Sequence, residues 1–242
     1  MYVKFSIAEW AAWAPGLADK AAWRAKFADT KGAWDSSDVT APVAELAPMT
    51  RRRLNRIGRS ALQVAYAVQA NHTPCPVIFA SRYGDLERSV VLLRALADHE
   101  SLSPTAFSVS VHNAIGAIFS IERVDTENYS ALAAGVDTVP CALVEASALL
   151  ADGADAVLLV VYEDPLPDVY AVFADTPQIP RAWACKIVPP NPASEVIALT
   201  KHRDCTAPSD ALSTLPLDLA VLSFFIGTAP SLEAHGWRYT RA

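Results

Sequence analysis

The stretch SALAAGVDTVPCALVEASALLADGADAVLLVVYE, residues 130–163, decides the fold. Residues 154–161 are apolar except for Asp155, which predicts a strand covered on both faces, as in a parallel sheet. Residues 140–150, just before it, are apolar on nearly every side, and Asp152-Gly153 ends the pattern where a helix C-terminus commonly has a glycine. The stretch therefore predicts an α/β protein with a buried helix at its centre.

A turn made of Gly135, Val136 and Asp137 precedes this helix. The N-terminus of a buried helix carries unpaired N–H groups and the positive end of the helix dipole. Both favour an anion or a reactive nucleophile. We therefore expect the turn to be the functional centre of the chain.

The composition excludes several classes of protein. Of the 242 residues, 52% are hydrophobic, which is high for a soluble monomer and predicts that some apolar surface meets a partner. A net charge of -6 argues against nucleic-acid binding, and no apolar run reaches the roughly 18 residues that span a bilayer. The first residues carry Lys4 and Glu9 and contain no apolar core of a secretory signal, so we expect an unprocessed protein. The four cysteines, Cys75, Cys141, Cys185 and Cys205, have no metal-ligand spacing, so we expect reduced thiols in a cytoplasmic protein without a metal or other cofactor.

Residues 130–163 resemble the nucleophile elbow of the β-ketoacyl synthases in the thiolase-like superfamily. In that family the catalytic cysteine opens a helix that ends in a glycine followed by Ala-Asp and an apolar strand. Counting back from Gly153 by the family spacing places the cysteine position at Val136, so the elbow would be Gly135, Val136 and Asp137 without its nucleophile. Cys141 lies about one and a half turns further into the helix, where it would point into packing.

The resemblance also implies a fold and an activity. It covers about residues 1–173 and implies thiolase-like α/β/α layers, the N-terminal half only, with a mostly parallel central sheet around a buried helix. Active members of the family use two histidines from their C-terminal half. His202 and His235 lack a comparable sequence context, so we expect no independent condensation activity.

A second segment, SLSPTAFSVSVHNAIGAIFSI at residues 101–121, resembles the synthase region that lies beside the elbow, the dimer interface and the acyl tunnel. If its helix abuts a partner's tunnel, Ile115, Ile118 and Phe119 are the candidates to gate it, because positions three and four apart share a helix face. His112 lies in the same segment without a nucleophile nearby, so a structural role is favoured over a catalytic one.

A basic cluster opens the helix expected over residues 51–70, for which Thr50 is a plausible N-cap. Positive charges at a helix N-terminus oppose the helix dipole, which suggests a use beyond helix stability. One interpretation is a docking patch for an acyl carrier protein, and the other is a solvated face or internal salt bridges. The candidate docking residues are Arg51, Arg52, Arg53 and Arg56.

The remaining pattern gives the domain organisation. Residues 1–188 are expected to form the ketosynthase-like domain, with a helix over 85–98 and strands over 1–7, 77–81, 169–173 and 182–188. Residues 189–210 are proline-rich and predict a linker or loop. Residues 211–242 would form a helix over about 211–226 and a tail that pack on the same domain.

The resemblance implies a noncatalytic chain length factor, like those of bacterial aryl polyene clusters. Such a subunit pairs with a full-length ketosynthase, shapes its acyl tunnel and meets an acyl carrier protein. Two alternatives remain open at this point. One is a purely structural subunit that stabilises the synthase, and the other is an acyl hydrolase or acyltransferase that uses Ser130 or Cys141.

Overall fold

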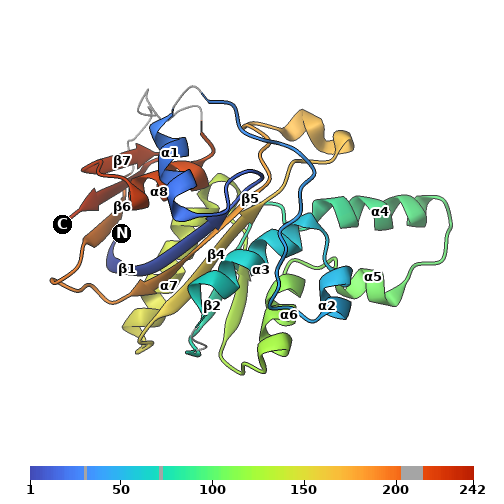
Figure 1. Ribbon diagram of the computed structural model, residues 1–242, viewed down its shortest axis with the longest axis horizontal. Helices are drawn as coiled ribbons and strands as arrows, with labels where there is room; N and C mark the ends of the chain where they lie inside the picture. Colours follow the sequence, from blue (N-terminus) through green and yellow to red (C-terminus); the bar gives the residue numbers. More distant parts are fainter. Residues whose placement is uncertain (30–31, 71–72, 203–214) are drawn as a thin grey trace.

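The computed structural model describes residues 1–29, 32–70, 73–202 and 215–242 of the chain (Figure 1). The strands of the described residues are β1 Tyr2–Trp13, β2 Val77–Ala80, β3 Tyr129–Leu132, β4 Val157–Glu163, β5 Arg181–Val188, β6 Val196–Lys201, β7 Ser231–Ala234 and β8 Trp237–Arg241. The α-helices are α1 Lys20–Ala28, α2 Pro48–Arg53, α3 Arg56–Val68, α4 Leu86–Ala97, α5 Pro104–Ser108, α6 Ala114–Arg123, α7 Thr138–Ala151 and α8 Leu217–Ile226. Two short 3₁₀ helices are η1 Gly135–Asp137 and η2 Asp168–Phe173.

All these strands join one sheet in the order β3-β2-β4-β5-β1-β6-β8-β7. The expected mostly parallel sheet is corrected here: only β3, β2 and β4 are parallel, and every other pairing is antiparallel. The physical reason lies in the segments that connect the strands along the chain. Helices cross over between β2, β3 and β4, as parallel pairing requires, whereas the two-residue turn that joins β7 to β8 allows only antiparallel pairing.

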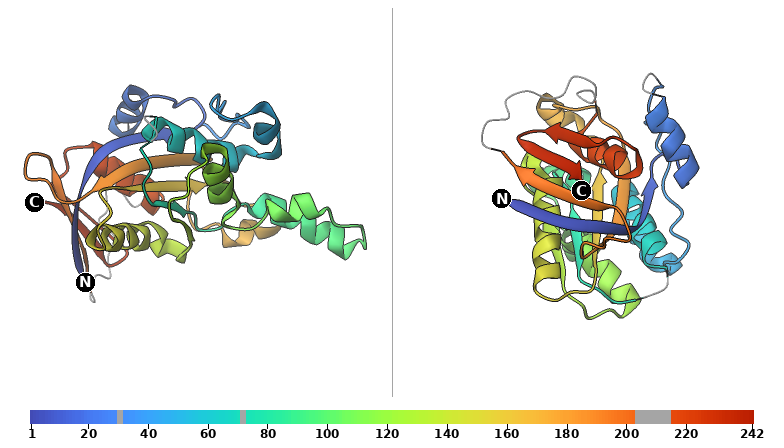
Figure 2. Two further views of the ribbon diagram at one scale, coloured as in Figure 1. Left: turned by 90° about the horizontal axis from the view of Figure 1, so that it is seen from below. Right: turned by 90° about the vertical axis from the view of Figure 1, so that its left-hand side faces the viewer.

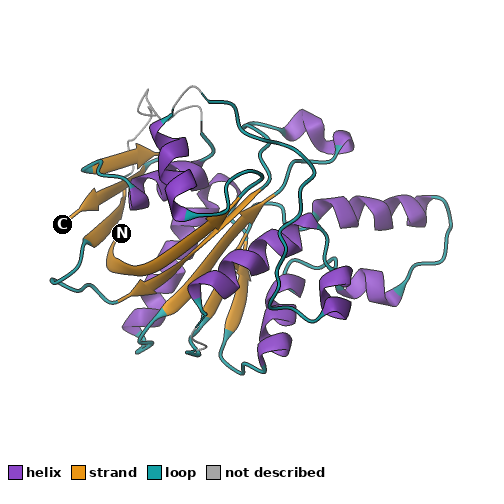
Figure 3. Cartoon of the chain, viewed as in Figure 1, coloured by secondary structure: helices purple, strands orange, loops and turns teal. Residues whose placement is uncertain are grey.

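Strand β4 shows how the sheet is covered on both faces. Val157, Leu159 and Val161 pack on the side of α7 and α8, and the alternate residues pack on the side of α3 and α6. Successive side chains of a strand point to opposite faces, so a continuous apolar run is required here. Figure 3 shows helices on both sides of the sheet. The expected layered α/β/α fold is confirmed.

Helix α7 follows the elbow, as expected, but it is not buried on all sides within this chain. Ala142, Leu143 and Ala146 are fully buried against the sheet, whereas Glu145 and Ala148 are exposed. The apolar residues beyond the sheet-facing side therefore lie at or near the surface of the single chain.

The helix expected over residues 51–70 is in fact two helices. Leu54 and Asn55 separate α2 from α3, and Asn55 caps α3 by accepting a hydrogen bond from the N–H of Gly58 at 3.4 Å. Thr50 is therefore not the N-cap: it lies inside α2 and donates to the carboxylate of Glu122 at 2.5 Å.

Helix α4 forms as expected, but its leucines do not face the core. Val90 is buried, whereas Leu93 and Leu96 are 53% and 58% exposed. Figure 2 shows why: α4 and α5 project from the body of the molecule as an arm, so the sheet does not cover them.

Three expectations near the C-terminus also need correction. Residues 168–173 form η2 rather than a strand, and Val169, Val172 and Phe173 are exposed. The linker expected over 189–210 contains β6, which pairs with the start of β1. The last helix begins at Leu217, and part of its expected span, together with Cys205, lies outside the described residues.

The chain after α8 is a β-hairpin rather than a tail. His235 and Gly236 have φ angles of 50° and 77°, the left-handed conformation that a two-residue hairpin turn requires. Strands β7 and β8 pair across this turn, and β8 adds them to the main sheet through β6.

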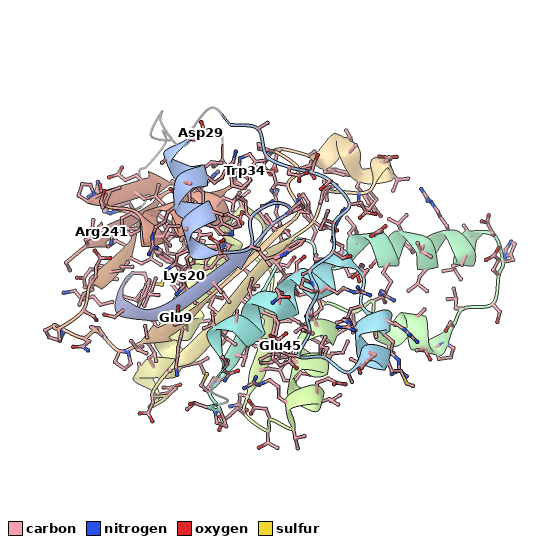
Figure 4. The ribbon with its side chains drawn as sticks, viewed as in Figure 1. Glu9, Lys20, Asp29, Trp34, Glu45 and Arg241 are labelled. Atoms are coloured by element: carbon pink, nitrogen blue, oxygen red, sulfur yellow. The ribbon has the colours of Figure 1, made fainter. Side chains whose placement is uncertain are left out.

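Helix α1 lies across β1 at the N-terminal side of the molecule. Figure 4 shows Lys20 of α1 beside Glu9 of β1, where the two form an ion pair. Trp23, Phe27 and Trp34 pack as an aromatic cluster at this crossing, with ring centroids 5.6–6.2 Å apart. Trp23 belongs to the core, and the partly buried Phe27 and Trp34 pack against it. Among the described helices, none is long and apolar enough to cross a membrane.

Candidate functional site

The elbow lies where the parallel strand β3 ends. Gly135 has a φ of 58°, so the chain turns sharply there before η1 and α7. The Thr138 hydroxyl donates to the Gly135 carbonyl at 2.7 Å and accepts the Ala134 N–H at 3.0 Å. The turn is therefore held by local hydrogen bonds, and Val136 at its tip is 42% exposed.

Asp137 joins the elbow to the C-terminal strands. Its carboxylate accepts hydrogen bonds from Lys201 Nζ of β6 at 2.9 Å and from Trp237 Nε1 of β8 at 3.1 Å. The Lys201 ammonium also lies 4.5 Å from the centre of the Trp237 ring. The segment after residue 188 thus anchors the elbow directly.

A pocket of about 350 Å³ opens beside Val136. It lies at the carboxyl ends of β2, β3 and β4, the edge at which parallel α/β sheets commonly bind ligands. Its other walls come from the segment before β5, the start of α8 and the β7–β8 hairpin. The pocket therefore needs both the synthase-like core and the C-terminal segment.

Two bidentate ion pairs frame the pocket. Arg82 binds Asp175 with both contacts at 2.7 Å, and Arg181 binds Asp218 with both contacts at 2.7 Å. The second pair is buried, and Arg181 also donates to the carbonyl of Ile179. Both guanidinium groups are thereby committed to partners within the chain.

Two acidic residues end strand β4 at the pocket. Burial raises the pKa of Glu163 to about 7, although Arg181 acts in the opposite direction. Burial also raises the pKa of Asp164 to about 6, against the effect of Arg56, which contacts its carboxylate at 2.9–3.1 Å. Perturbed carboxyl groups in a pocket mark a candidate ligand site.

The alternative nucleophiles do not meet a base in this pocket. Cys141 does not line it, and burial together with the Asp137 carboxylate raises the pKa of its thiol. Ser130 lies on β3 and is not among the lining residues either. A thiol that stays protonated at neutral pH is a poor nucleophile.

The histidines are placed differently from one another. His112 packs against Gly84 and lies 3.4 Å from the carbonyl of Leu132, outside the pocket. His235, which the sequence left in a tail, lines the pocket together with Val136. His202 is the last described residue before residue 215 and does not line the pocket.

The tunnel candidates lie on the other face of the sheet from α7. Ile115 and Phe119 are buried, and the Phe119 ring packs 5.3 Å from that of Tyr66 and 5.8 Å from that of Phe79. Ile118 is partly exposed on the same helix. The three residues share α6, but only Ile118 reaches the surface of this chain.

The structure separates the four candidate docking arginines. Arg56 binds Asp164 and Asp38, and Arg51 points to the carbonyls of residues 42 and 43. Arg52 and Arg53 are exposed, and neither forms an ion pair within the described residues. They line a groove between α2, α4 and α5 that Arg88 also borders.

Within the described ranges, no group of three or more His, Cys, Asp or Glu side chains is arranged to hold a metal ion. Cys75, Cys141 and Cys185 are free thiols.

The sequence profile of the β-ketoacyl synthase N-terminal domain matches residues 21–239, and the chain belongs to this family. Among curated proteins, no sequence matches the chain. The expected resemblance to β-ketoacyl synthases is thus confirmed.

Solved structures refine this family assignment. A structure of the ketosynthase ApeO in complex with its chain length factor ApeC from Xenorhabdus doucetiae contains a chain that is 28% identical, with a TM-score of 0.84 and coverage of 99% of this chain and 100% of that chain. The ishigamide ketosynthase/chain length factor is 15% identical with a TM-score of 0.66, and covers 84% of this chain and 68% of that one. A β-ketoacyl synthase from Burkholderia phymatum is 10% identical with a TM-score of 0.55, and covers 90% and 71%. The last two show the fold alone.

Several pocket residues escaped the sequence analysis. Arg82, Arg181 and Asp218 lie far apart in the chain and carry no motif. Glu163 was visible as the acidic end of an apolar strand, but only burial reveals its raised pKa. His235 could have been noticed from the His-Gly pair between two alternating segments, which is a hairpin signal.

Proposed function

We propose that this chain is a noncatalytic ketosynthase-like subunit that pairs with a full-length ketosynthase, as a chain length factor does. The observation that carries the proposal is the elbow, a sharp turn between β3 and α7 that presents Val136 at its tip. The whole-length similarity to a chain of a ketosynthase–chain length factor complex supports it. An aryl polyene product is the expectation that accompanies this similarity.

The surface of the chain also supports a partner. Leu93, Leu96 and Phe107 on the projecting arm are each more than half exposed, and β3 is an edge strand with a partner on one side only. Large apolar side chains gathered on one element and an open strand edge both favour association. We propose that the ketosynthase covers this arm and this edge.

Association can be tested by co-expression with a full-length ketosynthase and light scattering of the purified complex. Changing Leu93 and Leu96 to Asp should weaken the complex at least tenfold without unfolding the chain. Val172, which is 84% exposed on η2, is the matched control, and Val172→Asp should leave association unchanged. Equal effects of the two variants, or a monomer that ignores the synthase, would contradict the pairing.

The absence of independent condensation is tested separately. The chain alone, incubated with acyl thioesters, should show no acyl adduct by intact-mass measurement, because the elbow lacks a nucleophile. A stable adduct on Cys141 or Ser130 would instead favour the hydrolase or acyltransferase alternative.

We further propose that α6 contributes to the wall of the partner's acyl tunnel. Ile118 is the candidate gate that reaches the surface, whereas Ile115 and Phe119 would act through the packing that positions α6. Ile118→Ala should lengthen the products of the intact complex, because a smaller side chain leaves room for further methylenes. Each methylene gains only about 0.8 kcal/mol on burial, so one side chain can decide the stopping point.

The structural alternative predicts a different result. A subunit that only stabilises the synthase would leave product length unchanged in Ile118→Ala while its removal lowers synthase yield. One observation favours this alternative. Ile115 and Phe119 are buried in this chain's own core, so they cannot reach a partner's tunnel directly.

A further inference from the structure

The pocket beside Val136 contains one carboxyl group that no cation among the described residues neutralises by direct contact. Arg82 and Arg181 are each held by a carboxylate, and Asp164 is held by Arg56. Glu163 accepts one hydrogen bond, from the backbone N–H of Arg82 to Oε1 at 2.6 Å. Its Oε2 has no hydrogen-bond partner among the described residues.

The free oxygen faces the pocket rather than the packed interior. Glu163 is a lining residue, and Oε2 is absent from the buried polar atoms that lack a partner in the described structure. The Tyr83 side chain lines the same pocket and makes no hydrogen bond to another described residue. Glu163 therefore offers an acceptor to whatever enters.

The rest of the wall is apolar. The apolar lining residues are Val136, Val139, Leu217 and Leu232. The apolar part of a ligand could pack against them beside the carboxyl group of Glu163. Small-molecule sites commonly combine such a wall with a few polar groups that fix orientation.

An anionic ligand fits this pocket poorly. The nearby α7 N-terminus would favour an anion, but the carboxylate of Asp137 already lies at that end and Pro140 removes one of its N–H groups. Both guanidinium groups of the pocket are already paired. Among the described residues that line the pocket, the unpaired charge that remains is the negative charge of Glu163.

We propose that this pocket binds a small amphipathic cation, with a primary ammonium group on Glu163 and an apolar body against Val136 and Leu232. The ammonium donates hydrogen bonds to Oε2, and the apolar body displaces water from the wall. This ligand site is independent of the ketosynthase pairing, because every group that forms it belongs to the described chain.

Binding of such a cation depends on the ionisation of Glu163, since only the carboxylate form attracts it. Burial holds the pKa of Glu163 at about 7 in the free pocket. Affinity should therefore fall about tenfold for each pH unit below about 7 and level off above it. The charged and titratable groups that line the pocket with Glu163 are Arg82, Tyr83, Asp164, Asp175, Arg181, Asp218, Glu233 and His235.

The test is calorimetric titration of the full chain with n-hexylamine, n-hexanol and hexanoate. We expect hexylamine to bind at least tenfold more tightly than either of the others near pH 8. Near pH 7, repeating the titration in buffers of different ionisation enthalpy should reveal proton release, because the bound cation drives Glu163 to its charged form. Equal affinities for hexylamine and hexanol would overturn the proposed cation site. Tighter binding of hexanoate would overturn it too, because the pocket would then prefer an anion.

Variants distinguish binding at Glu163 from binding that depends only on the overall charge of the chain. Glu163→Gln keeps the shape and the contact to the Arg82 N–H but should lower hexylamine affinity at least tenfold and abolish proton release. Glu145→Gln, on the exposed side of α7, is the matched control and should change neither. His235→Asn should leave the pH dependence near 7 in place, and its loss in that variant would assign the titration to His235 instead. Val136→Trp should block binding by filling the pocket, while circular dichroism confirms that the variant is folded.

Discussion

The indole Nε1 of Trp237 donates a hydrogen bond of 3.1 Å to the carboxylate of Asp137, a residue one hundred positions earlier in the chain. Asp137 is the neighbour of Val136, so β8, the last strand in the described chain, holds the elbow directly. Lys201 completes this contact from β6. The C-terminal segment is therefore part of the site, not an appendage to it.

Removing either partner of the hydrogen bond between Trp237 and Asp137 should destabilise the protein, and the effects of the two changes should not be additive. A hydrogen bond to a charged group contributes about 1 kcal/mol when the pair is partly exposed. Trp237→Phe and Asp137→Ala should each lower the free energy of unfolding, and the double variant should lose about 1 kcal/mol less than their sum. Urea denaturation of the four proteins measures this coupling, and strictly additive losses would contradict it.

The buried pair of Arg181 and Asp218 should be far more sensitive to a single change. Asp218→Ala leaves a buried guanidinium without its counter-ion, which costs about 3–5 kcal/mol. The exposed pair of Arg238 and Glu233 is the control, where Glu233→Ala should cost less than about 1 kcal/mol. Chemical denaturation compares the two, and similar losses would show that the first pair is not buried in solution.

Stability should depend on pH through Glu163. In the folded protein the pKa of Glu163 is about 7, above the value of 4.5 for an unperturbed glutamate side chain. Between these two pH values the folded protein therefore binds a proton that the unfolded chain has released. The contribution of Glu163 to stability is therefore most favourable below about pH 4.5 and becomes a penalty as pH rises to 7. Asp164 acts in the same direction at lower pH.

Glu163→Gln tests this assignment. The variant should match the native protein in stability near pH 4 and exceed it by about 1–3 kcal/mol near pH 8, because glutamine carries no charge to bury. Thermal unfolding across this range gives the difference. A difference that does not vary with pH would assign the titration elsewhere.

Phe119 and Ile118 should behave differently although they are adjacent. Phe119→Ala removes a fully buried ring that packs on Tyr66 and Phe79, so it should cost about 3–5 kcal/mol of stability. Ile118→Ala, at a partly exposed position, should cost less. Denaturation of the chain alone gives both values, and comparable losses would place Ile118 in the core as well.

Of the four candidate docking arginines, Arg52 and Arg53 are the two that are exposed, and if an acidic carrier protein docks here these two should contribute most. Changing both to Glu should weaken carrier binding to the synthase complex about tenfold at low salt, and the difference should shrink at high salt. Arg24→Glu, an exposed change on α1, is the matched control. Titration of labelled carrier measures the affinity. If all variants bind the carrier protein with equal affinity, the two arginines form a solvated face rather than a docking site.

The local pattern of residues 130–163 was sufficient to predict the central part of the fold. An apolar run that alternates between two faces must be a covered strand, and a helix ended by Gly153 must precede it. The same pattern located Val136 at the elbow. These features depend on neighbours in sequence, so the sequence by itself determined them.

The pocket and the C-terminal half of the sheet could not be obtained in this manner. Strand β6 is stable because it pairs with β1 nearly the whole chain away, and Arg181 meets Asp218 across 37 positions. The exposure of Leu93 likewise follows from how α4 projects, not from its helical spacing. The sequence alone determined the turn at Gly135, Val136 and Asp137 before the helix, whereas tertiary structure decided the pocket, since burial and ion pairing arise only when distant segments are brought together.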